Sequence, residues 1–334
     1  MTDHDPYIGK REGTTTAYAT KEHPPSEEYV LGYFDSLSNW GRWGERDERG
    51  TLNLITPEAR KRAASAVRHG TSVSCAWELD TSPGGIERAT MSFGSAADLG
   101  IPGEHDHARW GSSGEHLSLA FHGSLHTHVD SLCHIFWDGH MYNGRPWEMV
   151  NADEGATWCA VTTAATGMVT RGILLDIPGL RGVPWLEHGE PVYPEELIAA
   201  EERQGVHVEP GDAVLLRTGY GRMRHETAHQ WDDPLHMSQS GWHASCLPWL
   251  HDRQVAYIGA DTDNDSMPSG YPGIFMPVHV VSLTAMGLWL MDNCDLEACA
   301  RTAEDLQQWE FLLSTCPLRM AGVSGSPVNP IATF

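Results

Sequence analysis

Short apolar runs, separated by Gly, Pro and charged residues, make up most of the hydrophobic pattern of this chain. Runs of this length that are rich in branched and aromatic side chains are typical of β-strands. The predicted strands cover residues 72–79, 117–121, 160–169, 172–176, 213–217 and 255–259.

Helical patterns are fewer. The order Thr-Pro-Glu at 56–58 predicts a helix start, and the helix is expected to end near Val67. Pro-Glu-Glu opens a second predicted helix over 194–204, and a third is predicted over 296–313. The apolar run 280–291 is mixed and fits no single period.

Strands mixed with a few helices, without a regular β-α-β repeat, predict an α+β or irregular α/β fold. Residues 1–30 are polar and have no period, so we expect an irregular N-terminal arm that either extends freely or lies on a neighbouring subunit. Residues 31–334 are expected to form a single domain.

The charge balance narrows the choice of partners. The chain has 22 basic and 45 acidic residues and a formal net charge of −23, which disfavours nucleic acid and membrane surfaces. No segment approaches the roughly 18 apolar residues of a spanning helix, and the N-terminus has no signal-peptide core, so a cytoplasmic protein is expected. The seven cysteines form no Cys-x-x-Cys pair and are expected to be free, mostly buried thiols.

Histidine is abundant, and the histidines concentrate between His122 and His140. In an extended segment, His122, Ser124, His126, His128 and Asp130 would project from one face. Imidazole nitrogens and a carboxylate suit Zn, Mn, Fe or Co, whereas Ca and Mg require mostly oxygen ligands. The alternative is that these histidines are core or surface residues with ordinary hydrogen bonds.

The segment 124–134 resembles the signature of the cyclase family of metal hydrolases, which includes bacterial kynurenine formamidase and isatin hydrolase: His-x-Gly-Thr-His-x-Asp-x-Pro-x-His. It matches the signature at Thr127, His128, Asp130 and His134. It departs from the signature at three positions: Ser124 replaces the first His, His126 replaces the Gly and Leu132 replaces the Pro.

Further similarity to the family lies at 43–53, 172–176, 211–219 and 325–331, in the family's order. The resemblance implies a mixed β-sheet with a barrel-like swivelling β/β/α core and a few flanking helices. It also implies a homo-oligomer, a dimer or a tetramer, which agrees with the polar arm.

The resemblance also assigns roles. It makes His128 and Asp130 metal ligands and His134 the residue that transfers protons. Because Ser124 cannot replace an imidazole, we hypothesise that His126 supplies the missing ligand, with His122 as the next candidate.

A later segment of the family brings a further His and an acidic residue to the same centre, and His279 and Asp292 are the matching residues here. The alternatives are that His279 is a hydrogen-bonded core histidine and that Asp292 caps the helix beginning near Leu296. Asp in place of the family's Glu leaves open whether one or two ions bind.

The sequence also offers weaker candidates for substrate contacts. Trp43, Phe136 and Trp137 are predicted to wall a pocket for a flat or apolar substrate, although packing is the alternative role. Asn53 is a candidate polar contact to the substrate or a turn residue. The pattern does not favour a function for four further residues. Asp261, Asp263 and Asp265 resemble a calcium loop but are better explained as a solvated turn, and Cys133 is expected to be a buried neutral thiol.

A divalent ion, Mn or Zn, lowers the pKa of a bound water and polarises a carbonyl, and a nearby histidine can move the proton. The chain is therefore expected to hydrolyse a carbon–nitrogen bond of a small cyclic or aryl amide, with a lactone or ester next. Two alternatives stay open: a metal-dependent lyase or cyclase that acts through an enolate, and a metal-free binding protein of the same fold.

Overall fold

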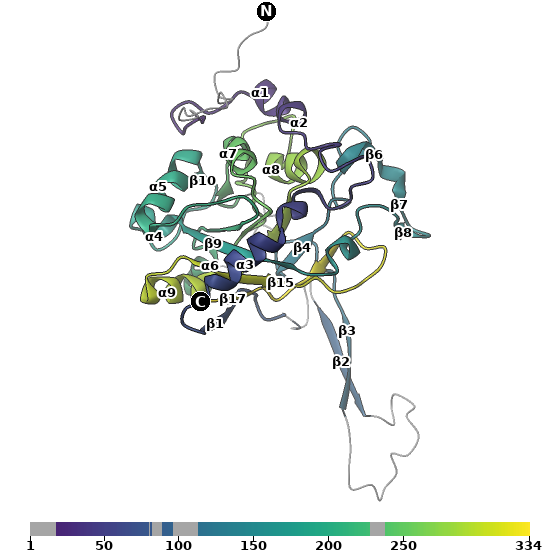
Figure 1. Ribbon diagram of the computed structural model, residues 1–334. Helices are drawn as coiled ribbons and strands as arrows, with labels where there is room; N and C mark the ends of the chain where they lie inside the picture. Colours follow the sequence, from purple (N-terminus) through teal and green to yellow (C-terminus); the bar gives the residue numbers. More distant parts are fainter. Residues whose placement is uncertain (1–17, 80, 82–88, 96–112, 228–237) are drawn as a thin grey trace, which may run out of the picture.

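The computed structural model describes residues 18–79, 81, 89–95, 113–227 and 238–334 (Figure 1). Its centre is a nine-stranded mixed sheet. In spatial order the strands are β1 (Ser72–Ser74), β17 (Ile331–Thr333), β15 (Glu310–Thr315), β9 (Met168–Asp176), β11 (Ala213–Arg217), β13 (Tyr257–Ala260), β14 (Trp289–Asp292), β4 (His128–Asp130) and β16 (Gly325–Pro327). The helices are α1 (Glu27–Leu31), α2 (Tyr33–Ser36), α3 (Pro57–Ser65), α4 (Ile177–Arg181), α5 (Pro194–Gln204), α6 (Tyr220–Thr227), α7 (Leu247–Asp252), α8 (Pro277–Val281) and α9 (Glu297–Leu306).

The middle of the sheet is parallel: β9, β11, β13 and β14 follow one another with their carboxyl ends at one edge. These strands are almost entirely buried, as expected for parallel strands covered on both faces. On one side, β4 pairs antiparallel with β14 and with β16. The mixed sheet with few helices confirms the fold class expected from the sequence and the resemblance.

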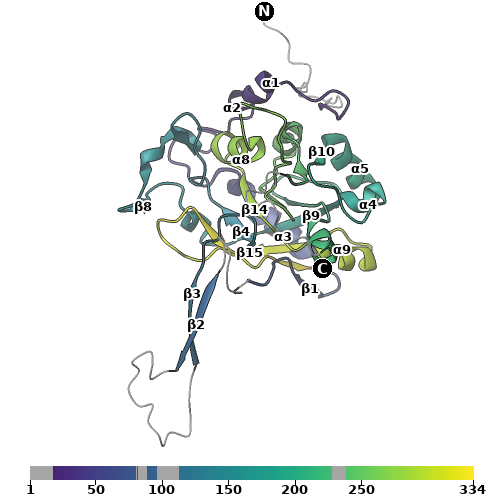
Figure 2. The ribbon, with the colours of Figure 1, turned by 180° about the vertical axis from the view of Figure 1, so that it is seen from behind.

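Four two-stranded ribbons complete the strands: β2 (Thr90–Ser95) with β3 (Ser113–Ser118), β5 (His140–Met141) with β6 (Arg145–Pro146), β7 (Val150–Asn151) with β8 (Gly155–Ala156), and β10 (Pro191–Val192) with β12 (Gly241–Trp242). In both ribbon views, β2 and β3 project away from the rest of the molecule (Figures 1 and 2). No helix in the described ranges is long and apolar enough to cross a membrane.

Local sequence signals predicted the central elements well. The helix over 194–204 and the strand over 213–217 agree with α5 and β11, and β9 contains the strand predicted over 172–176. Within the predicted arm, α1 begins at Glu27, and residues 1–17 lie outside the described part.

Two predicted elements are wrong. The helix expected over 296–313 ends at Leu306, where Gln307 adopts a left-handed conformation with φ 49°, and β15 follows with alternating buried residues. The strand expected over 160–169 begins instead with a 3-10 turn at Val161–Ala164. The mixed run 280–291 divides into the end of α8, a π turn over Ser282–Met286 and β14.

Gly50 allows the segment around it to pack closely against the central sheet. Its φ is +57°, and a Cβ there would lie 2.1 Å from the carbonyl oxygen of Gly287, just before β14. The Thr51 amide donates a hydrogen bond to the same oxygen at 2.8 Å. The two backbones can approach this closely only if residue 50 lacks a side chain.

Replacing Gly50 with Ala is therefore expected to lower the free energy of unfolding by about 3 kcal/mol, because strain at positive φ and the clash with Gly287 add up. Urea denaturation measures the change. Gly41→Ala is the matched control, since Gly41 has φ +74° but nothing lies within 4 Å of its Cβ position; a loss of about 1 kcal/mol is expected there. Equal losses in the two variants would contradict the steric explanation.

Candidate metal centre

Strand register builds the centre of the site. Strands β14 and β4 lie side by side (Figure 2). The last residue of β14, Asp292, is directly opposite His128 at the start of β4, and Asp130 ends the same short strand. Residues that face each other across an antiparallel pair bring their side chains within contact distance. The result is a buried group of His128, Asp130 and Asp292, whose possible ligand atoms all lie within 4.8 Å of one another.

The His128 ring is oriented by the backbone. Its Nδ1 is 2.8 Å from the carbonyl oxygen of His126, which can only accept, so Nδ1 carries the proton. Nε2 then directs its lone pair towards the carboxylates, 3.5 Å from Asp130 Oδ1 and 3.6 Å from Asp292 Oδ2. A backbone carbonyl that fixes the tautomer in this way is a common feature of metal-binding histidines.

A second group shares Asp130. Its other members are His122 and His134, and their ligand atoms also lie within 4.8 Å of one another. His122 Nδ1 is 2.8 Å from Asp130 Oδ1, and His134 Nε2 is 3.6 Å from Asp130 Oδ2. The two imidazoles stack on each other, with centroids 3.9 Å apart and planes within 6°. Their side chains are 28% and 26% exposed, against 1% for Asp130, so this pair forms the solvent-facing side of the centre.

His279, the third residue of α8, approaches from a different direction. Its Nδ1 donates to Asp265 Oδ2 at 2.8 Å, and its Nε2 lies 3.1 Å from Asp292 Oδ2 and 3.8 Å from Asp130 Oδ2. The Asn264 amide donates to the other oxygen of Asp292. Both His279 and Asp292 are buried.

The charges of the centre depend on one another. Burial lowers the pKa of His279, but the Asp292 and Asp265 carboxylates outweigh it and raise that pKa well above its usual value. Burial also acts to raise the pKa of Asp130, but His134, His128 and His122 hold it below its ordinary value. His134 behaves differently, because burial lowers its pKa to about 4 and Asp130 opposes this only partly. Asp130 is thus kept anionic and His134 is kept neutral near pH 7.

The residues present fit a divalent cation. His122 Nδ1 and Asp130 Oδ1 are buried and pair with each other at 2.8 Å, and neither makes any other hydrogen bond within the described ranges. Gathering buried carboxylate oxygens and imidazole nitrogens at one point is costly, and a cation bound among them would offset that cost. Imidazole nitrogens with carboxylate oxygens are the donors that Mn, Zn, Fe and Co accept.

The model of the Cyclase family, described as "Putative cyclase", matches residues 97–264, half of the chain. The chain belongs to the cyclase family. This confirms the resemblance drawn from the motif at 124–134.

Solved structures support the cyclase fold over most of the chain. A crystal structure described as a novel cyclase matches 90% of this chain and 99% of its own, at 28% identity and a TM-score of 0.79. Isatin hydrolase A from Labrenzia aggregata, bound to benzyl benzoate, matches 81% of this chain and 96% of its own, at 19% identity and a TM-score of 0.53. An isatin hydrolase bound to the product analogue thioisatinate matches 83% and 98%, at 13% identity and a TM-score of 0.51. No curated protein matched the sequence.

Five of the residues matched to the cyclase family lie together: His128, Asp130, His134, His279 and Asp292. Asp292 does not cap the last helix, because α9 begins after Leu296 without a side-chain cap.

His126 lies elsewhere. It is buried but belongs to neither metal-ligand group among the described residues. The extended conformation expected for 122–130 is wrong before residue 128, since β4 comprises only His128–Asp130 and Gly123 has φ +137°. The bend in this segment brings His122 to Asp130 instead.

The predicted substrate contacts make other interactions. Asn53 donates to Asp47 Oδ1 at 2.7 Å and to the Gly50 carbonyl, which is a turn role. The Trp43 ring lies under the Arg42 guanidinium at 4.6 Å. Two aromatic contacts lie downstream of the centre: Trp137 stacks on Phe34 at 4.7 Å, and Phe136 meets Trp147 edge-on at 6.3 Å. Cys133 is a buried free thiol whose pKa burial raises to about 11, as the sequence predicted.

The solvated turn predicted for Asp261, Asp263 and Asp265 is wrong. Asp261 and Asp265 are buried, and Asp261 accepts hydrogen bonds from the Thr218 amide and hydroxyl and from the Gly219 amide. The aspartates follow β13 at the carboxyl edge of the parallel strands, where the neighbouring loops cover them. Acidic residues directly after a buried strand were the available signal for this second layer of the site.

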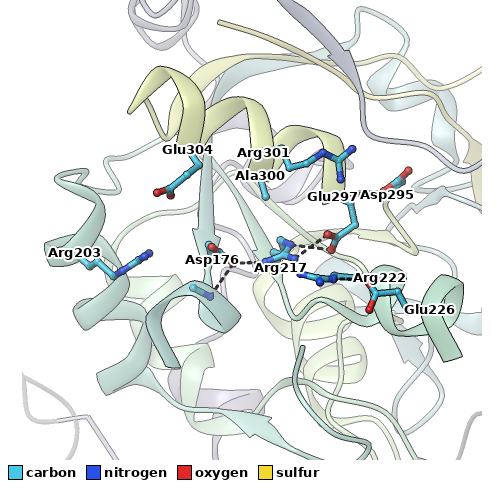
Figure 3. Close-up of a pocket in the computed structure, with 11 residues that line it drawn as sticks. Asp176, Arg203, Arg217, Arg222, Glu226, Asp295, Glu297, Ala300, Arg301 and Glu304 are labelled. Carbon is cyan, nitrogen blue, oxygen red and sulfur yellow. Dashed lines mark hydrogen bonds and ion pairs between the residues drawn. The ribbon is translucent and has the colours of Figure 1, made fainter. Parts of the chain in front are cut away.

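A separate cavity of about 660 Å³ opens at the ends of β9 and β11, between α6 and α9 (Figure 3). Arg217 lies at its centre and pairs with Asp176 at 2.6 Å and with Glu297 at 2.8 Å. These two carboxylates neutralise Arg217, so the structure gives it a role in packing the strand ends. The charged lining does not fit a flat apolar substrate.

Proposed function

We propose that this protein is a metal-dependent hydrolase that opens an amide, lactam or lactone bond of a small cyclic or aromatic substrate. The observation that carries the proposal is the layered arrangement around Asp130. A buried group of His128, Asp130 and Asp292 lies beneath two stacked, partly exposed imidazoles, His122 and His134.

The buried layer would hold the ion. His128, Asp130 and Asp292 offer ligand atoms to one point, and His279 Nε2 lies against the two carboxylates. When bound, a divalent ion such as Mn or Zn supplies an activated water and polarises the carbonyl of the substrate.

His134 would move the proton. Burial lowers its pKa to about 4, so near pH 7 its imidazole is neutral and can accept a proton. Asp130 Oδ2, 3.6 Å from Nε2, then stabilises the imidazolium until the proton passes to the leaving nitrogen or oxygen. His122, stacked on the same ring, fixes the plane of His134.

The substrate class rests on the fold relatives and on nearby aromatic residues. The solved isatin hydrolases act on isatin, a cyclic amide fused to a benzene ring. Phe136 and Trp137 lie two and three residues after His134 and are partly buried, in contact with Trp147 and Phe34, so aromatic surface lies close to His134 along the chain. A compact aromatic lactam or aryl amide is therefore the first class to test, and we expect the enzyme to act as a homo-oligomer.

The experiment removes metal with a chelator, restores Mn or Zn, and measures hydrolysis of isatin, formylkynurenine and simple lactones in water enriched in oxygen-18. Hydrolysis requires that the label enter the product and that turnover return with the metal. Product without label would favour a lyase or cyclase reaction. Full turnover in the chelated protein would refute a metal-dependent mechanism.

His126→Ala is expected to leave the metal content unchanged, because the His126 side chain belongs to neither ligand group in the described structure. His128→Ala, two residues away, is expected to lose the metal. Elemental analysis of the two purified variants makes the comparison. Loss of metal from His126→Ala would restore this residue as the substitute for the ligand missing at Ser124.

A further inference from the structure

The position where the cyclase signature has its first metal-binding histidine is occupied by Ser124. Ser124 is buried, and its hydroxyl donates a short hydrogen bond to Asp263 Oδ2. This serine therefore does not leave a gap in the site. It connects the motif segment to a carboxylate from the loop after β13.

Asp263 differs from the two aspartates beside it. Asp261 is held by Thr218 and Gly219, and Asp265 accepts from the Val278 and His279 amides and from the His279 ring. Those bonds account for the oxygens of both carboxylates.

Asp263 retains a buried oxygen, Oδ1, that makes no hydrogen bond of normal geometry within the described ranges; the nearby Asn293 side chain, which lowers the pKa of this carboxyl, donates to the Gly123 carbonyl instead. A buried carboxylate oxygen without a donor is unfavourable unless a cation satisfies it.

The backbone holds this loop against the centre. The Asn293 amide donates to the Thr262 carbonyl at 3.0 Å, and Asn264 donates to the Asp292 carboxylate. Asp263 therefore lies between two residues that are tied to the end of β14.

Electrostatics place Asp263 in the same cluster. Burial raises the pKa of Asp263 and the neighbouring Asp292 charge adds to this, while the Ser124 and Asn293 side chains and the charge of His279 oppose it. In turn, Asp263 is one of the carboxylates that raise the pKa of His128. The carboxylate interacts with both the histidine and the aspartate of the buried layer.

We propose that Asp263, oriented by Ser124, replaces the missing histidine as a ligand of the metal centre. Asp263 lies outside both three-residue groups, so as a ligand it would have to turn its side chain towards the ion. The inference rests on the proposed function, since it requires that the centre bind a divalent ion.

This replacement changes the chemistry of the donor set. Asp130, Asp263 and Asp292 supply oxygens, and His128 and His279 supply nitrogens. Carboxylate-rich sites favour Mn, whereas an added imidazole favours Zn. The centre of this chain is therefore biased towards Mn relative to the histidine-containing signature.

Calorimetric titration of the chelated protein with Mn²⁺ and Zn²⁺ tests the proposal. Asp263→Asn is expected to weaken Mn²⁺ binding by about 100-fold, since even the loss of a residue that only orients a ligand costs about 10- to 100-fold in metal affinity. Zn²⁺ binding is expected to weaken less, because Zn²⁺ depends less on carboxylate oxygens. Ser124→Ala, which keeps the carboxylate but removes its orienting bond, is expected to weaken Mn²⁺ binding by about tenfold.

Asp261→Asn is the matched control, because it alters a buried aspartate of the same loop whose bonds go to Thr218 and Gly219. It is expected to keep the wild-type affinities. The double variant Ser124→His with Asp263→Ala restores the signature histidine and should recover tight binding with Zn²⁺ preferred over Mn²⁺.

The outcomes separate the two proposals. If the wild-type protein binds neither ion, the proposed function fails. If it binds Mn²⁺ and Asp263→Asn binds equally well, the role of Asp263 fails and the proposed function stands. Should Asp263→Asn not fold, as judged by circular dichroism, Ser124→Ala decides, and unchanged Mn²⁺ affinity in that variant overturns the inference.

Discussion

Replacing His134 with Ala should reduce kcat/KM by about 100- to 10,000-fold, the usual contribution of a positioned general acid–base residue. The reason is that His134 is the partly exposed imidazole that burial keeps neutral near pH 7, and it lies beside Asp130. Metal content should stay close to that of the wild-type protein, because the buried layer is intact. Steady-state kinetics on the substrate selected in the oxygen-18 screen, together with elemental analysis, provides both values.

His140→Ala is the control for this variant. His140 lies on the same stretch of chain but is exposed, and its ring bonds to the carbonyl of Asp138 at 2.7 Å. The kcat/KM of the His140→Ala variant should equal that of the wild-type protein. If His134→Ala keeps full turnover, His134 does not transfer the proton, and His122, stacked on it, becomes the candidate.

The Asp130→Asn variant should lose the metal altogether. Asp130 is the residue common to both ligand groups, it is buried, and the imidazoles of three histidines lower the pKa of its carboxyl. Loss of residues behind a ligand costs about 10- to 100-fold in metal affinity, so loss of this shared ligand should cost more than 100-fold. Turnover should fall to the background rate. Calorimetric titration and kinetics at saturating Mn²⁺ measure the two effects.

Asp138→Asn serves as the matched substitution. Asp138 is exposed and has φ 46°, a backbone conformation that Asn tolerates well. The variant therefore replaces a carboxylate with an amide outside the centre without straining the backbone. It should bind metal as the wild-type protein does. Metal retained by Asp130→Asn would mean that the ion is held by His279 and Asp292 without this carboxylate.

The sequence predicted the parts of the fold whose signals are local. The Pro-Glu-Glu start located α5, and the apolar run at 213–217 located β11, because capping and continuous burial act within a few residues. The end of α9 was missed because Gln307 turns the chain into β15, and an amphipathic helix followed by an alternating strand reads as one long apolar pattern.

The site divides in a similar way. The motif spacing placed His128, Asp130 and His134 together, since they lie within one strand and the turn after it. The choice between His122 and His126 depended on the bend at Gly123, which strand alternation does not encode. Asp263 and Asp265 reach the centre because β13, which precedes them, pairs with β14, and this contact joins segments that are distant in sequence.

The position of β4 also bears on how the protein is made. This strand lies between β14 and β16, and both of those strands come much later in the chain. During synthesis, His128 and Asp130 therefore emerge long before the strands that enclose them. The grouped side chains can come together only after Asp292, the last of them in the chain, has been made, so a metal ion could bind there only late in synthesis.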